Sequence, residues 1–103
     1  MRGLGTWYAK PMKVVILYRP NAEFASEVEA YVQDFQKRFF EAGKRIEMVS
    51  VDSREGVSQA ELYDIMQFPA ILAVANDGSI LNSWVGMPLP LMNDIAGYAL
   101  SGR

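Results

Sequence analysis

The sequence contains no cysteine and no histidine, and these two absences exclude much of the chemistry that small domains perform. Without cysteine the chain forms no disulfide, presents no thiolate nucleophile and offers no sulfur ligand to a metal ion. Without histidine it has no Ser-His or Cys-His catalytic pair and few means of holding zinc or copper. We therefore expect no catalytic residue of these types and no metal site built on them.

An excess of positive charge and long apolar runs are also missing. The net charge is −2 and the isoelectric point is near 5.0, so no basic field attracts nucleic acid or anionic lipid. The apolar run at residues 70–75 is far shorter than the roughly 20 residues that a membrane-spanning helix needs. No secretory signal is evident, so we expect a cytoplasmic protein with neither a nucleic-acid nor a membrane partner.

Length and composition are typical of one small globular domain. The chain has 103 residues, of which 50% are hydrophobic, enough for a modest core. Residues 1–12 show no hydrophobic periodicity and contain the aromatic pair Trp7 and Tyr8, so we interpret them as an N-terminal arm. Residues 13–103 are interpreted as the domain itself.

Four segments have the pattern of β-strands. Residues 14–18 (VVILY) and 70–75 (AILAVA) are continuous apolar runs, typical of strands buried on both faces of a sheet. Residues 45–52 and 80–85 are more polar, and the second of these suits a half-exposed edge. The turn sequence NDGS at residues 76–79 predicts that the last two strands form a hairpin. The two apolar runs are expected in the middle of the sheet.

Three segments have the pattern of helices. Apolar residues at spacings of three and four across residues 24–39 predict a long helix, capped by Asn21 and ended by Gly43. Ser58 begins the capping box SQAE of a short second helix, and Pro90 suits the first turn of a last helix. The inner stripe of that last helix is predicted to hold Leu91, Ile95 and Tyr98 or Ala99. The order is therefore β-α-β-α-β-β-α, an α/β fold with a four-stranded mixed sheet and helices on both faces.

Three motifs resemble the thioredoxin family in its minimal, glutaredoxin-like form. Residues 14–18 resemble the family's central strand, and residues 64–81 (DIMQFPAILAVANDGSIL) resemble its helix end, cis-proline, strand, turn and strand. Residues 83–86 (SWVG) resemble its closing strand and glycine. The resemblance covers roughly residues 13–100. It implies a thioredoxin-like fold with a cis bond before Pro69, which accounts for a proline at the head of an apolar strand.

The resemblance also indicates an activity that this chain has lost. The family's reaction requires two cysteines two residues apart at the start of the first long helix. Aligning that helix places Ala22 and Ala25 where the two thiols would lie. The buried acid of the family's central strand is absent too, because Ile16 and Leu17 occupy that stretch. We therefore expect a redox-inactive domain that is not an enzyme and carries no cofactor.

The first hypothesis for function is an adaptor that binds a protein or peptide in the groove where the family binds its substrates. Arg19 could hold a carboxylate or phosphate there, or be a solvated surface charge. Phe68 and Met87 could form apolar walls, or belong to the periphery of the core. The groove residues that the resemblance implies are Arg19, Asn21, Ala22, Phe68, Pro69, Gly86 and Met87.

Two other hypotheses stay open at this stage. Asp52 and Glu55 lie near the end of a predicted parallel strand and could bind Mg²⁺ or act as acid and base, although acids at this place commonly form turns and caps. Trp7, Tyr8 and Trp84 could instead support self-association as a homodimer, with the edge strand at residues 80–85 involved. Trp84 could equally pack under the last helix.

Overall fold

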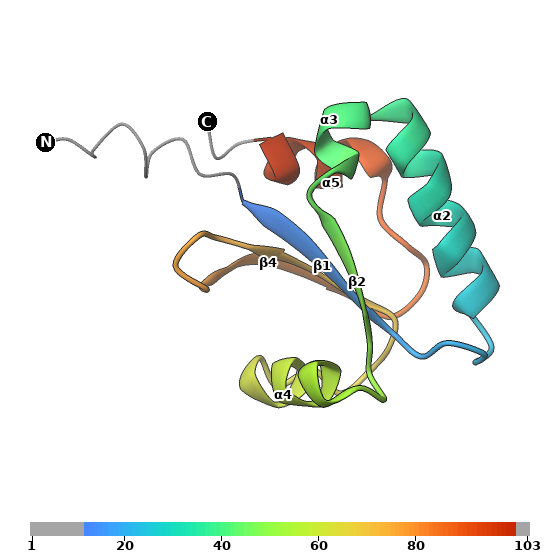
Figure 1. Cartoon of the computed structure of the whole chain (residues 1–103), viewed down its shortest axis with the longest axis vertical. Coiled ribbons are helices and arrows are strands. Elements are labelled where there is room, and N and C mark those ends of the chain that lie inside the picture. Colours follow the sequence, from blue (N-terminus) through green and yellow to red (C-terminus); the bar gives the residue numbers. More distant parts are fainter. Residues whose placement is uncertain (1–11, 101–103) are drawn as a thin grey trace, which may run out of the picture.

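A four-stranded mixed sheet lies at the centre of residues 12–100, the part of the chain that this computed structural model describes (Figure 1). The strand order is β2-β1-β3-β4, with β1 and β2 parallel and the other neighbours antiparallel. This arrangement confirms the predicted fold, to which the structure adds the short helix α3. The strands are β1 (Lys13–Tyr18), β2 (Ile46–Ser50), β3 (Ala70–Val74) and β4 (Ile80–Val85), and the helices are α2 (Ala25–Arg38), α3 (Phe40–Gly43), α4 (Arg54–Leu62) and α5 (Met92–Leu100).

The two apolar runs form the two central strands, β1 and β3, as predicted. Successive side chains of a strand point to opposite faces of the sheet. Val14 and Ile16 of β1 therefore enter one core, and Val15 and Leu17 enter the other. All four side chains are at most 1% exposed. Burial on both faces explains why neither run alternates with polar residues.

The helices α2, α3 and α5 cover one face of the sheet, and α4 covers the other (Figure 1). Val28, Val32 and Phe35 of α2 recur at the predicted helical spacing and are buried. Ile95 and Ala99 of α5 complete this first core and are fully buried. The predicted apolar stripes of α2 and α5 are therefore confirmed at these positions.

Both ends of α2 differ from the prediction. The helix begins at Ala25, and the residue before it, Phe24, provides no side-chain cap. The predicted Asn21 cap was wrong, because Asn21 adopts a positive φ of 66° and turns the chain before the helix begins. Gly43 ends α3 and not α2; a Cβ added there would lie 2.9 Å from the Cα of Gln36.

The helix α4 begins earlier than predicted, and Ser53 caps it. The Ser53 Oγ accepts a hydrogen bond from the N–H of Gly56 at 3.0 Å. Ser58 lies inside the helix, so the predicted capping box was wrong. The backbone of α4 lies close to the end of β2, because a Cβ added to Gly56 would clash with the carbonyl oxygen of Ser50.

The strands β3 and β4 form the predicted hairpin. Gly78 in its turn has a φ of 92°, which favours glycine, and its N–H donates to the carbonyl of Ala75 at 2.9 Å. The Tyr63 hydroxyl, just after α4, donates to the carbonyl of Gly78 at 2.8 Å and so ties the turn to the α4 side. The register of the hairpin shifts between Ala73 and Val74, which marks a β-bulge.

The edge strand β4 has alternating half-buried and exposed residues, as predicted. Trp84 packs edge-on against Tyr98 of α5, with ring centroids 5.6 Å apart and ring planes at 74°. Asn82 donates to the Tyr98 hydroxyl at 3.1 Å and accepts the N–H of Ser83 at 2.7 Å. Trp84 therefore belongs to the margin of the first core, the alternative that the sequence left open.

The helix α5 begins at Met92, so Pro90 precedes the helix instead of occupying its first turn. Leu91 is 74% exposed, and its predicted place in the inner stripe was wrong. The Tyr31 hydroxyl of α2 donates to the carbonyl of Pro90 at 2.7 Å and holds this segment against the helix. Burial, with a smaller effect of the Asp94 charge, raises the pKa of Tyr31 to about 12.

Candidate functional site

A depression of about 270 Å³ lies at the edge of the sheet where the chain leaves β1. Leu17 near the end of β1 pairs with Ala70 at the start of β3. The loop that follows β1 therefore meets the segment that precedes β3, and the first turns of α2 close the third side. The apolar residues that line the depression are Ala22, Phe24, Ala25, Val28, Phe68 and Pro69.

Of the groove residues expected from the sequence, the structure brings Arg19, Ala22, Phe68 and Pro69 together around this depression. Asn21 belongs to the same loop, where it is exposed, but it is not part of the lining.

The two expected groove residues after β4 lie outside the depression. Gly86, with a φ of 82°, donates its N–H to the carbonyl of Pro69 at 2.7 Å, so it lies beside the wall that Pro69 forms. Met87 lines a separate, more open hollow of about 450 Å³, together with Glu27 and Tyr31 of α2. The Phe68–Pro69 and Met87–Pro88 peptide bonds are both cis.

Two methyl groups occupy the positions at which the sequence comparison places the thiols. Ala22 and Ala25 both line the depression, and the N–H of Ala25 donates to the carbonyl of Ala22 at 3.2 Å. Ala25 is buried, whereas Ala22 is exposed. This wall therefore offers small apolar surface and no nucleophile.

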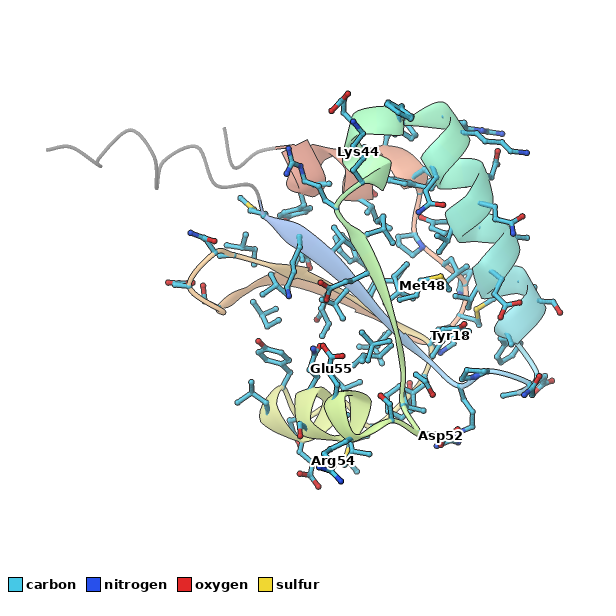
Figure 2. The ribbon with its side chains drawn as sticks, in the orientation of Figure 1. Tyr18, Lys44, Met48, Asp52, Arg54 and Glu55 are labelled. Atoms are coloured by element: carbon cyan, nitrogen blue, oxygen red, sulfur yellow. The ribbon has the colours of Figure 1, made fainter. Side chains whose placement is uncertain are left out.

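Arg19 is ion-paired within the chain. Its Nε lies 3.3 Å from Oδ1 of Asp52, and the two side chains are 55% and 62% exposed. Tyr18 pairs with Ser50 in the parallel register of β1 and β2, so the residues that follow the two strands meet at one edge of the sheet. Figure 2 shows Asp52 just beyond the end of β2, on the Tyr18 side. The carboxylate beside Arg19 therefore comes from Asp52 of the same chain and not from a bound ligand.

Asp52 and Glu55 have different partners within the described residues. Asp52 pairs with Arg19, while Glu55 accepts a hydrogen bond from Gln59 at 3.2 Å on α4. Across residues 12–100 no group of three or more aspartate or glutamate side chains is placed to hold a metal ion.

Tyr18 also lines the depression and was not among the groove residues expected from the sequence. Its hydroxyl donates to Oε2 of Glu29 at 3.3 Å. Burial raises the pKa of Tyr18, and the charge of Glu29 and this hydrogen bond raise it further. Tyr18 could have been expected at the site from the sequence, because it is the last residue of a central strand and open α/β sheets place their sites at strand ends.

Phe68 combines a half-buried side chain with an unpaired backbone. Its side chain packs against the second core, between the sheet and α4. Within the described part of the chain, neither its N–H nor its C=O has a hydrogen-bond partner. Pro69 has no N–H, and its carbonyl is bound by Gly86. Phe68 is therefore the point in this wall where an added strand could form backbone hydrogen bonds.

No protein-family model and no curated protein matches the chain. Among solved structures, the C-terminal domain of DsbD from Neisseria meningitidis in its oxidised form is similar, with a TM-score of 0.63 and 22% identity, covering 93% of this chain and 84% of that one. The first two thioredoxin domains of Eps1p from Saccharomyces cerevisiae give a TM-score of 0.61 and 17% identity over 94% of this chain and 37% of that one. A structure described as that of a malarial protein gives a TM-score of 0.61 and 19% identity, covering 86% of this chain and 93% of that one.

These similarities establish the class of fold. The chain has a thioredoxin-like fold, as the resemblance in its sequence implied. It has no cysteine, so it lacks the two thiols of the CxxC motif. None of the helices within residues 12–100 has the length and apolar character needed to cross a bilayer.

Proposed function

We propose that this domain binds an extended peptide segment of a partner protein in the depression and carries out no reaction there. The observation that carries the proposal is the free backbone of Phe68 beside an apolar depression. An extended peptide needs both features, because its backbone pairs with an exposed edge and its side chains enter pockets. The alanines at positions 22 and 25 leave the peptide room to lie against the loop without a covalent step.

The size of the depression favours a peptide over a small-molecule cofactor. Its volume is about 270 Å³, below the roughly 300–1,000 Å³ of most small-molecule sites. Such a volume suits one or two apolar side chains. We therefore infer a peptide that places a single leucine-sized or phenylalanine-sized residue between Phe24 and Phe68, both of which are half-buried.

Peptide binding can be mapped by NMR with isotope-labelled protein and a library of blocked octapeptides that carry a central leucine or phenylalanine. We expect shifts centred on residues 19–25 and 67–70. Phe68→Ala should weaken binding several-fold while the spectrum keeps its native dispersion. Phe40→Ala, at a 67% exposed position of α3, is the matched control. Shifts confined to residues 80–85 would contradict the proposal and favour pairing at the β4 edge.

The absence of catalysis is tested by the turnover of a disulfide substrate with a thiol reductant supplied. We expect the rate with the protein to equal the rate in buffer, because the chain has no thiolate to attack a disulfide. Turnover above the buffer rate that Phe68→Ala abolishes would contradict the proposal.

Self-association is the competing function. Sedimentation velocity at several protein concentrations separates the two, because a monomer keeps one sedimentation coefficient throughout. We favour the monomeric binder, since Trp84 packs against Tyr98 within the domain. Trp7 and Tyr8 lie outside the described residues.

A further inference from the structure

The positive charge at the depression is already neutralised. Arg19 lines the depression, but its Nε is 3.3 Å from the carboxylate of Asp52. Arg54, on α4, points away from the sheet (Figure 2) and does not line the depression. Lys37 and Arg38 lie in the last turn of α2, at the opposite end of that helix from the depression.

The negative charge at the same place is not neutralised. Glu23 lines the depression and is exposed. Among the described residues it forms no ion pair and accepts no side-chain hydrogen bond. Glu27, in the first turn of α2, is likewise exposed and unpaired within residues 12–100. Glu29 adds a third carboxylate, whose partner within residues 12–100 is the neutral Tyr18 hydroxyl.

The N-terminus of α2 contributes positive charge at the depression, but less than the negative charge of the nearby carboxylates. A helix N-terminus is equivalent to roughly half a positive charge and therefore attracts anions. Glu23 and Glu27 together carry about two negative charges beside that half charge. The balance at the depression is negative, so a cationic group is favoured over an anionic one.

We propose that the peptide bound at this site carries a lysine or arginine within two residues of its apolar anchor. The anchor enters the depression beside Phe68, and the cationic side chain lies against Glu23. This inference rests on the proposed peptide binding and specifies the chemistry of the ligand. It differs from the alternative offered by the sequence, in which Arg19 holds a carboxylate or phosphate of the ligand.

The test compares blocked octapeptides that share a central leucine or phenylalanine and differ only in one neighbour, which is lysine, glutamine or glutamate. Affinities are measured by fluorescence anisotropy at about 0.05 M and about 0.5 M salt, where screening of exposed charges differs strongly. We expect the lysine peptides to bind roughly 1.5- to 5-fold more tightly than the glutamine peptides at low salt, the range of an exposed ion pair. The preference should shrink at high salt.

Glu23→Gln should reduce the ratio of lysine-peptide to glutamine-peptide affinity at low salt, and the ratio is compared within each variant so that a general effect on binding cancels. Glu61→Gln is the matched control, because Glu61 is an exposed acid on α4, across the sheet from α2. Equal binding of all three peptides, or tighter binding of the glutamate peptides, would overturn the charge preference and leave peptide binding intact. No binding by any peptide would overturn both proposals.

Discussion

The two faces of the sheet are covered in different ways. On the first face, α2 and α5 fill the core with side chains, of which Phe35 is the largest fully buried one. On the second face, the only fully buried residue of α4 is Gly56, whose backbone lies against Ser50. The helices of the first face contribute large buried side chains, whereas α4 contributes the partly buried Ala60 and a close backbone approach at Gly56. The spacing of hydrophobic residues in the sequence therefore predicts the helices of the first face well and α4 on the second face poorly.

The largest expected effect is on the first face. Phe35→Ala should lower the free energy of unfolding by about 3–5 kcal/mol, because it leaves a cavity among fully buried side chains. Val57→Ala, at a 45% exposed position of α4, should change it by less than about 0.5 kcal/mol. Urea unfolding of both variants measures the difference. Similar losses in the two variants would mean that the faces do not differ as described.

A pair of glycines tests the close approach on the second face. Gly56→Ala should destabilise the domain by about 1–3 kcal/mol, because its Cβ meets the carbonyl oxygen of Ser50. Gly97→Ala in α5 should stabilise it by about 0.5–1 kcal/mol, because nothing lies within 4 Å of the added Cβ and alanine favours a helix. Both changes add one methyl group to a helix, so thermal unfolding isolates the clash. A stabilising Gly56→Ala would refute the close approach.

The cap of α4 separates the observed helix start from the predicted one. Ser53→Ala removes the hydrogen bond to the N–H of Gly56 and should cost about 1 kcal/mol. Ser58→Ala, inside the helix, should be neutral or slightly stabilising. The denaturant midpoints of the two variants show which serine caps α4. A larger loss of stability in Ser58→Ala than in Ser53→Ala would mean that the helix begins at the predicted residue.

A smaller effect is expected at Tyr31, which ties the segment before α5 to α2. Tyr31→Phe removes the hydrogen bond to Pro90 and should cost about 0.5–1.5 kcal/mol near neutral pH. The pKa of Tyr31 rises from 10.0 to about 12 in the folded domain. The unfolded chain therefore loses this proton first, and the stability linked to it is present below pH 10 and is lost between pH 10 and pH 12.

Unfolding midpoints of the native protein and the Tyr31→Phe variant should therefore converge as the pH rises through that window. Parallel midpoints across the whole range would show that the folded-state pKa of Tyr31 is unshifted.

The sequence predicted those parts of the fold that depend on hydrophobic period. The buried runs of β1 and β3 and the stripe of α2 could be recognised because their burial leaves a direct pattern in the chain. The start of α4 could not, because Ser53 and Ser58 are both suitable caps and local pattern does not choose between them. The choice depends on Gly56 fitting against Ser50, a contact between two elements.

The candidate site was predicted in position more than in chemistry. Phe68, Pro69 and the loop at Arg19 were expected together, and they do line one depression. The partner of Arg19 was missed because Asp52 is distant in the chain and becomes its neighbour only through the parallel register of β1 and β2. Glu23 was not among the expected groove residues, since its place in the wall depends on where α2 begins.

Asn82 has a consequence for the behaviour of the protein in concentrated solution. The edge strand β4 contains no charged residue and no proline, and such edges are prone to edge-to-edge aggregation. In an antiparallel pair, hydrogen-bonded and non-hydrogen-bonded residue pairs alternate along the strands. Gly86 is hydrogen-bonded to Pro69, so the pair of Ser83 and Leu72 is a non-hydrogen-bonded one, and the N–H of Ser83 faces away from β3. The Asn82 side chain occupies that N–H, and the nearby bulge increases the local twist. The Asn82 amide thus removes one of the outward N–H groups with which the edge of a second molecule could pair.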